Sequence, residues 1–427
     1  MLQDKTERKL EHLATFGGLL ILVSMMLSWE VSRVCYFLLA VVALWMMVRF
    51  PARLGRDEKL YIYPILFFFS SALMSYLLND SPKRGPQILV ETFSLLMLSI
   101  PLVIFYGRFP PRQIATSTMF VCCVFAATLV SVYDLWSTPH LRAGGSTGQA
   151  ILFSTIVLGA TVVVAACLHQ YLKKPYWQFI CLCLLIGCGI FTLILTGSRG
   201  SWIALPVIAM LFVLFYFRTT VWYKKWAGIL LISVVTPIIS YQVPYVKQRV
   251  DFAVDQTSEI FVDGSGQERK LTSIGIRVAL WRAAFEIFQN NPVLGVGPGS
   301  YRMVMKKYVA DNNVEWQLQN YKHAHNQFLN TLMTKGLVGL IALLVMLTSH
   351  TYIFLRHLKH EHPEIRAMAM GGCMIIFSYL ILSLTSSPFE RKITLVFYGF
   401  SLCLLIGRIV FLKKQTEPAS RSVETAN

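Results

Sequence analysis

The chain has 427 residues, of which 55% are apolar and only 14% are charged. Its mean hydropathy of +0.56 excludes an ordinary soluble domain of this size. The net charge of +17 does not indicate nucleic-acid binding, because the Lys and Arg residues fall in loops between apolar runs. Membrane proteins carry their topological signals in such loops.

Apolar runs long enough to cross a hydrocarbon core of about 30 Å recur along most of the sequence. Lipid offers backbone groups no other partners, so such runs form helices. We therefore predict an all-α polytopic membrane protein with about 12 transmembrane helices. The predicted spans centre near Ile21, Val42, Phe69, Met97, Val124, Leu158, Leu185, Met210, Ser233, Leu344, Phe377 and Leu402.

The distribution of Lys and Arg predicts the orientation of these spans. The loops that share a side with both termini hold about 21 basic residues, whereas the short loops of the other side hold about 7. Basic residues are retained on the cytoplasmic side. We therefore expect both termini to be cytoplasmic.

One connection is much longer than the others and divides the chain. We expect transmembrane helices 1–9 in residues 1–243, a helical periplasmic loop domain in residues 244–323, and helices 10–12 in residues 324–412. Residues 413–427 have the composition of a disordered cytoplasmic tail. Loops as long as the periplasmic one are usually functional.

Within the long loop, "TSIGIRVALWRAAFEIFQNNP" predicts an amphipathic helix that ends at Asn290-Asn291-Pro292. Arg282 and Glu286 form an i,i+4 pair typical of a solvated face. Arg277 instead lies on the apolar face, near the positive end of the helix dipole, where an anion binds well. The alternative is an arginine whose stem covers apolar surface while its head stays in water.

The helix is followed by the glycine-rich segment "NPVLGVGPGSY". Its glycines allow tight turns and close backbone approach, but their spacing is not that of a dinucleotide fingerprint. A shaped connection is the simplest interpretation, and a phosphate-facing loop is the alternative. We keep Gly297, Gly299 and Tyr301 as candidate substrate-binding residues.

Arg199 stands alone in the very short outer loop "TGSRGSW" between two apolar runs. A charge at such a depth is costly and often marks a functional site. The alternative is an interfacial arginine that reaches lipid headgroups.

His325 lies at or just before the first turn of a helix predicted from Asn326 onward. A neutral histidine accepts a proton at ordinary pH, and Asn326 can orient its ring or bind a polar substrate. His323 lies two residues away and does not share a face with His325 suited to one metal. No acidic cluster on the outer side suggests a divalent metal, so we expect no metal and no cofactor.

Two arginines and one histidine suit the transfer of a sugar from a lipid diphosphate. Arginines at positions 199 and 277 can stabilise the diphosphate leaving group with forked hydrogen bonds. The acceptor hydroxyl is a weak nucleophile and needs a base, for which His325 is the candidate. Such a set favours direct displacement with inversion, without a metal.

These motifs resemble those of the O-antigen ligases of Gram-negative bacteria, within the O-antigen ligase and polymerase superfamily. The resemblance implies a twelve-span fold of the membrane glycosyltransferase C type in the bacterial inner membrane. It also implies transfer of O-antigen from undecaprenyl diphosphate to a sugar of lipid A–core oligosaccharide at the periplasmic face. The sequences that carry it are "TGSRGSW", "RVALWRAAFEIFQNNPVLGVGPGSY" and "HAHNQFLNTLMTKGLVGL".

By motif, the resemblance places the diphosphate-binding arginines at Arg199 and Arg277 and the catalytic histidine at His325. Arg142 and Gly144 fit a further superfamily motif, but its Asn-Pro is missing here. The expected partners are therefore the lipid-linked donor, the lipid A–core acceptor and membrane lipids, with the protein a monomer.

Three alternatives remain. An O-antigen polymerase uses the same donor but a lipid-linked repeat as acceptor. A protein-targeted oligosaccharyltransferase belongs to the same superfamily. A transporter for a lipid-linked glycan is the third, although transporters usually place titratable groups near the bilayer midplane.

Overall fold

The computed structural model describes residues 2–51, 53–79, 85–138, 142–167, 176–216, 247, 273–312 and 314–424. Over these ranges the chain is helical and contains no strand. The α-helices are α1 (Leu2–Leu27), α2 (Trp29–Arg49), α3 (Arg56–Leu78), α4 (Gly85–Ile88), α5 (Ser94–Met97), α6 (Ser99–Tyr106), α7 (Gln113–Ser137), α8 (Ala150–Ala166), α9 (Tyr176–Leu195), α10 (Arg199–Tyr216), α13 (Ser273–Asn290), α14 (Tyr301–Asn312), α15 (Gln327–Leu355), α16 (Pro363–Ser383) and α17 (Lys392–Glu424).

Four shorter helical segments complete the described elements. A π-helical turn, η1 (Leu89–Phe93), joins α4 to α5. The 3₁₀ segments are η2 (Gly145–Thr147), η4 (Trp316–Asn320) and η5 (Pro388–Glu390).

In the described part of the chain, nine helices are long and apolar enough to cross a membrane, and Ala150–Ala166 and Arg199–Phe215 are shorter apolar helices. Together they coincide with every predicted span except the one near Ser233, which lies outside the described residues. The prediction of an all-α polytopic membrane protein is confirmed.

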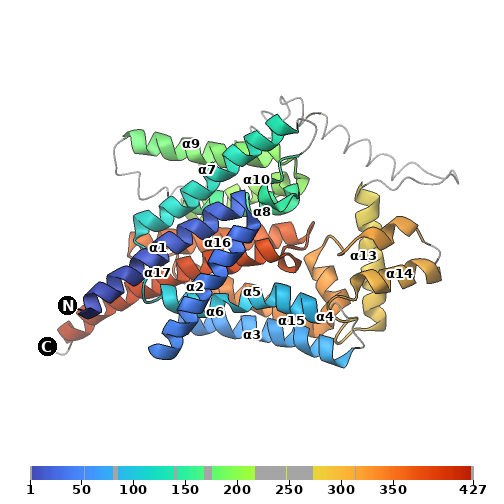
Figure 1. The fold of residues 1–427 in the computed structure, drawn as a ribbon, viewed down its shortest axis with the longest axis horizontal. Coiled ribbons are helices and arrows are strands. Elements are labelled where there is room, and N and C mark those ends of the chain that lie inside the picture. The colour runs from blue at the N-terminus through green and yellow to red at the C-terminus, as the bar shows by residue number, and fades with distance from the viewer. Residues whose placement is uncertain are drawn as a thin grey trace.

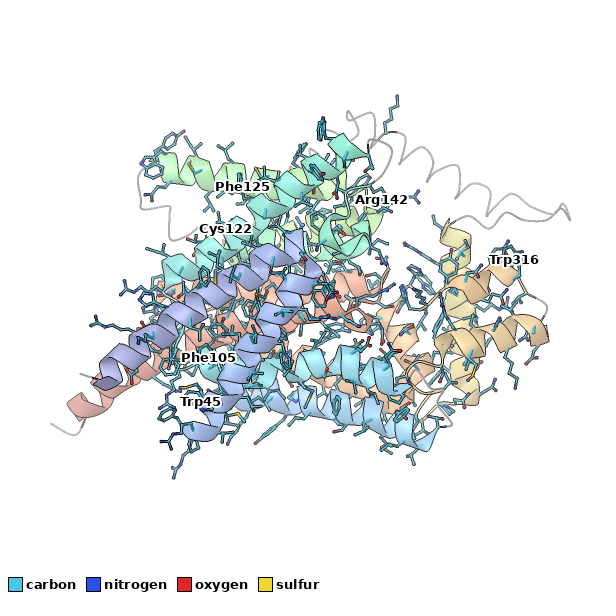
Figure 2. The ribbon with its side chains drawn as sticks, in the orientation of Figure 1. Trp45, Phe105, Cys122, Phe125, Arg142 and Trp316 are labelled. Atoms are coloured by element: carbon cyan, nitrogen blue, oxygen red, sulfur yellow. The ribbon has the colours of Figure 1, made fainter. Side chains whose placement is uncertain are left out.

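The helices pack in a bundle whose centre is formed by α16 and α17. In the apolar stretches of these two helices, 78% and 89% of the residues are buried inside the protein. Large apolar side chains on the peripheral helices point outward instead. Trp45 on α2 and Phe125 on α7 are 58% and 52% exposed (Figure 2). Such outward apolar side chains are expected where lipid replaces water.

The start of α1 and the end of α17 lie at one end of the bundle, and α13 and α14 lie at the other (Figure 1). The α17 helix continues to Glu424. Residues 413–424 are therefore helical in this structure, in contrast to the irregular tail that their composition predicts.

We call residues 273–326 the cap. Its helix α13 begins and ends where the amphipathic pattern predicts, and it packs against α15. The cap has its own apolar core, separate from that of the bundle. That core is formed by Leu280, Ala283, Ala284, Ile287, Tyr301, Met305, Val309, Leu318, Ala324 and Met333.

The cap is tied to a break in α15. Gly336 has φ 64° and ψ −163°, which interrupts the helix. The glycine-rich segment supplies the replacement hydrogen bonds. Val296 N and Gly297 N donate to the carbonyls of Met333 and Thr334, and the N–H groups of residues 337 and 338 donate to the carbonyls of residues 292 and 293. The glycine-rich segment therefore serves as a shaped connection, which is the simpler of the two interpretations of its sequence.

We expect Gly336→Ala to destabilise the protein strongly. A Cβ at this position would lie 2.2 Å from Val293 O, a backbone atom that cannot rotate away. The backbone conformation is also almost restricted to glycine and costs about 1–3 kcal/mol in other residues. Thermal unfolding in detergent should show a clear decrease in midpoint. Gly187→Ala is the matched control, because a Cβ there meets no atom within 4 Å; equal midpoints in the two variants would contradict the expectation.

Candidate active site

The two histidines of "HAHN" meet at the junction of the cap and α15. Asn326 caps α15, so His325 lies just before the helix rather than on its first turn. His325 is the one non-glycine residue with positive φ, +52°, among those described. This left-handed conformation brings two side chains at i and i+2 together, with ring centroids 4.3 Å apart. The alternation expected of a regular strand or helix does not hold here.

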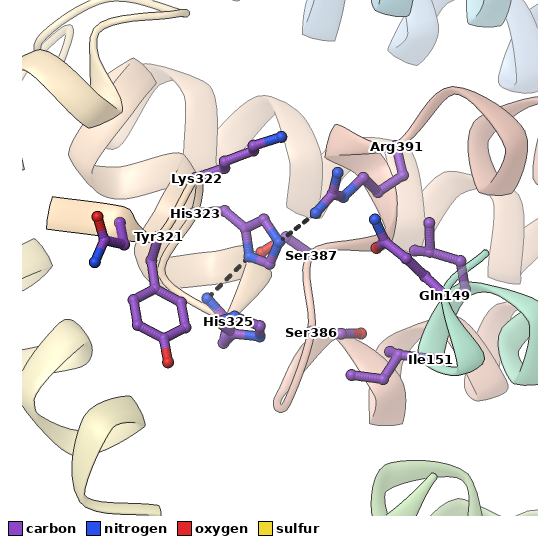
Figure 3. Close-up of a pocket in the computed structure, with 11 residues that line it drawn as sticks. Gln149, Ile151, Tyr321, Lys322, His323, His325, Ser386, Ser387 and Arg391 are labelled. Carbon is purple, nitrogen blue, oxygen red and sulfur yellow. Dashed lines mark hydrogen bonds between the residues drawn. The ribbon is translucent and has the colours of Figure 1, made fainter. Parts of the chain in front are cut away.

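His323 is 9% exposed and lies between His325 and Arg391 (Figure 3). Its Nε2 lies 2.8 Å from an Arg391 NH group, and its Nδ1 accepts a hydrogen bond of 3.3 Å from the backbone N–H of His325. A neutral imidazole has one acceptor nitrogen, so the ring cannot fully satisfy both donors at once. Burial, followed by nearby positive charge, lowers the pKa of His323 to about 2, so this ring is neutral.

Arg277 and Arg199 belong to the same group of charges. Burial, and then the charge of Arg199, lowers the pKa of Arg277. Burial, and then the charges of Arg277 and Arg391, lowers the pKa of His325 to about 4. The structure therefore places Arg277 within electrostatic reach of both Arg199 and His325, which are far apart in the sequence. Position 199 lies at the start of α10, position 277 in the second turn of α13 and position 325 at the end of the cap.

Arg142 holds the loop that carries Arg199. Its Nε and one NH₂ group donate to the carbonyls of Thr196 and Gly197 at 2.8 and 2.9 Å. Asp134 at the end of α7 in turn accepts from the backbone N–H groups of residues 144 and 145. The structure thus gives this arginine a positioning role beside the site.

We expect Arg142→Gln to loosen this loop and to expose Arg199 to trypsin. Hydrogen bonds from a charged donor contribute about 1.5–3 kcal/mol each, and about 1.4 kcal/mol corresponds to a factor of ten. Cleavage after Arg199 should therefore be accelerated about tenfold or more. The control is Arg33→Gln, which removes an exposed arginine paired with Glu30. An unchanged cleavage rate in Arg142→Gln would remove the positioning role.

The remaining predicted residues lie in structural positions. Asn326 Oδ1 accepts from the N–H groups of Phe328 and Leu329, so its side chain is a helix cap. Tyr301 is 5% exposed and packs in the cap core. Gly297 donates its N–H to Thr334 O, and Gly299 has φ +88° in the turn before α14. Asparagine directly before an apolar helix is itself a cap signal, which favours that role in the sequence as well.

Arg391 also belongs to the site, although the sequence alone does not indicate it. It follows η5, a turn that is held firmly against α15. Phe389 N donates to Gln327 Oε1 at 2.9 Å, and the fully buried Lys335 ammonium donates to Glu390 at 2.7 Å. Arg391 is hydrogen-bonded to a residue 68 positions away in the chain. In the sequence it reads as one more basic residue at the edge of a span.

A cavity of about 200 Å³ lies beside the histidine pair. Its walls include His323, His325, Arg391, Lys322, Ser387 and Gln149 (Figure 3). Within the described ranges no group of three or more potential metal ligands occurs. The arrangement offers a neutral imidazole in a strongly positive surrounding. It can bind anions and can accept a proton.

Parts of the chain are similar to known proteins. Residues 183–344 match the family model described as O-antigen ligase. A segment covering 56% of the chain is 24% identical to 54% of an O-antigen ligase of Escherichia coli. A segment covering 81% is 22% identical to 57% of a ComP-specific O-oligosaccharyltransferase of Acinetobacter baylyi. An uncharacterised protein of Haemophilus influenzae is 23% identical, with 82% of this chain matching 86% of that protein. The chain thus spans little more than half of the two relatives whose names state an activity.

The fold is that of a multi-pass membrane protein, and the site gathers anion-binding and proton-accepting groups at one end of it. Residues 183–344 of the chain are similar to the O-antigen ligase family. The family and these relatives support a ligase-type glycosyl transfer. The matched segment includes Arg199, Arg277 and His325 and ends before Arg391.

Proposed function

We propose that the protein is an O-antigen ligase in lipopolysaccharide biosynthesis. It transfers O-antigen polysaccharide from undecaprenyl diphosphate to a sugar of lipid A–core oligosaccharide. The reaction takes place at the periplasmic face of the bacterial inner membrane, with both termini in the cytoplasm. The observation that supports this most is the convergence of Arg199, Arg277 and His325 on one site.

In this proposal each group acts on a different part of the displacement. The two arginines bind the donor diphosphate and stabilise its charge as it leaves. His325 accepts the proton of the acceptor hydroxyl, whose oxygen attacks the anomeric carbon. The carbon–oxygen bond to the diphosphate breaks as the new glycosidic bond forms, with inversion. The step requires no metal.

The lipopolysaccharide profile of a deletion strain tests this proposal. Loss of a ligase leaves lipid A–core bare while polymer accumulates on undecaprenyl diphosphate. Loss of a polymerase instead leaves core capped by a single repeat. Transfer by the purified protein in detergent, with EDTA present, would exclude both a transporter and a metal requirement.

A second candidate follows from the relative in Acinetobacter baylyi. That protein is named an O-oligosaccharyltransferase specific for ComP, and the match covers 81% of this chain. The same donor site would then serve a protein acceptor. Glycan on a periplasmic protein, lost in the deletion strain while lipopolysaccharide is unchanged, would favour this candidate over the ligase.

A further inference from the structure

The cavity beside the histidine pair has an unusual charge composition. Arg391 and Lys322 line it together with the hydroxyl side chain of Ser387 and the amide of Gln149, and none of the described residues that line it is acidic. Cations without carboxylates in a concave site favour a negatively charged ligand.

Among the described residues no carboxylate forms an ion pair with Arg391, although the charge of the adjacent Glu390 acts on it. The Arg391 side chain is partly buried, which lowers its pKa, yet arginine stays charged. The hydrogen-bond partner of Arg391 is the neutral ring of His323. The neighbouring carboxylate of Glu390 is paired with Lys335 at 2.7 Å. The neutral imidazole satisfies the charged guanidinium of Arg391 only partly. An anion that enters the cavity could therefore form a charge-assisted hydrogen bond with Arg391.

Ser387 provides an independent sign of a missing ligand. Its side chain is 3% exposed and lines the cavity, and its Oγ is buried without a hydrogen-bond partner among the described residues. A buried hydroxyl without a partner is destabilising. A ligand with an oxygen in the cavity would satisfy it.

The position of the cavity relates it to the acceptor. Arg277 and Arg391 both act electrostatically on the histidine pair, but Arg391 lines the cavity, whereas Arg199 and Arg277 do not. In a displacement the nucleophile approaches from the side opposite the leaving group. If Arg199 and Arg277 bind the leaving diphosphate, the cavity is available for the acceptor, whose hydroxyl is the attacking group.

The geometry points to an anion-recognising subsite for the acceptor glycan, in which Arg391, Lys322 and Ser387 bind a phosphate or carboxylate of the acceptor beside His325. This inference rests on the proposed function for the nature of the reaction, but not for the presence of the subsite. Arg391 is then a specificity-determining residue that contacts the acceptor and leaves the donor unaffected.

Steady-state kinetics of Arg391→Gln, with donor and acceptor varied separately, test this assignment. We expect the KM for the acceptor to rise about tenfold or more, since a charge-assisted pair contributes about 1.5–3 kcal/mol. The KM for the donor should change less than twofold. Lys392→Gln is the matched control, because this adjacent cation pairs with Glu91 outside the cavity and should change neither KM. A rise in donor KM in Arg391→Gln, with acceptor KM unchanged, would overturn the assignment.

Modified acceptors identify the anion. Lipid A–core is supplied intact, dephosphorylated or with its carboxyl groups reduced. Removal of the recognised anion should reproduce the Arg391→Gln defect in the unmodified protein and add nothing in the variant. If both modified acceptors work as well as the intact one, the subsite does not recognise an anion.

Binding measurements separate this inference from the proposed reaction. Ligand-observed NMR compares glucose 6-phosphate and glucuronic acid with glucose as probes, using purified full-length protein. Binding of a charged probe that Arg391→Gln abolishes and Lys392→Gln retains supports the subsite, even if no transfer is found with any acceptor. Transfer without charged-probe binding and without an effect of Arg391→Gln on the acceptor KM refutes the subsite and leaves the proposed reaction intact.

Discussion

Replacing His325 by asparagine is expected to lower the rate of transfer by a factor of about 100–10,000, the usual contribution of a general base. Donor binding should survive, because the two arginines remain. Asparagine is the informative substitution since it tolerates left-handed backbone better than most residues, and position 325 has φ +52°. Alanine would add backbone strain to the loss of the imidazole.

The comparison of three variants makes this test decisive. His325→Asn and His325→Gly should fold with an unfolding midpoint near that of the unmodified protein, and His325→Ala should be slightly less stable. Added imidazole should partly restore transfer in the glycine variant, where space is left for it. Full transfer by His325→Asn at neutral pH would exclude the base assignment.

The low pKa of His325 predicts how the rate of transfer depends on pH. Because its pKa is about 4 in the free protein, the ring is neutral and able to accept a proton throughout the neutral range. The acid limb of kcat/KM, which reports the free enzyme, should therefore lie near pH 4. A bound diphosphate offsets the positive charge that lowers this pKa, so the limb of kcat should lie at higher pH. An acid limb of kcat/KM near 6.5 would contradict this.

Arg277→Gln should reduce kcat/KM by a factor of about 100–1,000, in the range of other losses of transition-state charge stabilisation. Donor binding should weaken together with the rate if, as we propose, the guanidinium contacts the diphosphate before and during its departure. Steady-state kinetics with varied donor measure both. Removal of this charge also raises the pKa of His325, so the acid limb of kcat/KM should shift to higher pH.

Arg282→Gln is the matched control on the same helix. The Arg282 side chain is 81% exposed and pairs with Glu286, and exposed pairs contribute about 0–1 kcal/mol. Its removal should leave both kinetic constants unchanged. Equal losses in the two variants would mean that positive charge on α13 acts only at long range.

The sequence predicts the helices of the bundle well because each apolar run indicates on its own that it lies in lipid. A run such as that of α16 must be helical in lipid wherever its neighbours lie. The ends of α13 are equally local, since Asn-Asn-Pro stops a helix on its own. Three residues of the candidate site also carry local signals, because each is a polar residue where an apolar pattern is expected.

Features that depend on long-range contacts are not accessible in this way. Arg391 resembles a topological signal, and its approach to His323 exists only once α15 and α17 have packed. The close approach of the His323 and His325 rings depends on a left-handed backbone conformation at His325. The sequence "HAH" does not predict this conformation, because histidine adopts it only occasionally. The site assignments themselves stay predictions until the variants are measured.

The break in α15 has a consequence for biogenesis. At Gly336 the helix leaves backbone groups that are satisfied by residues 292–297. Unsatisfied groups of this kind are costly in lipid. The partner segment precedes α15 in the chain, so it is synthesised first and is available when α15 forms. Insertion of this helix and docking of the cap are therefore one coupled step of assembly, and the junction that holds the histidine pair is formed in that step.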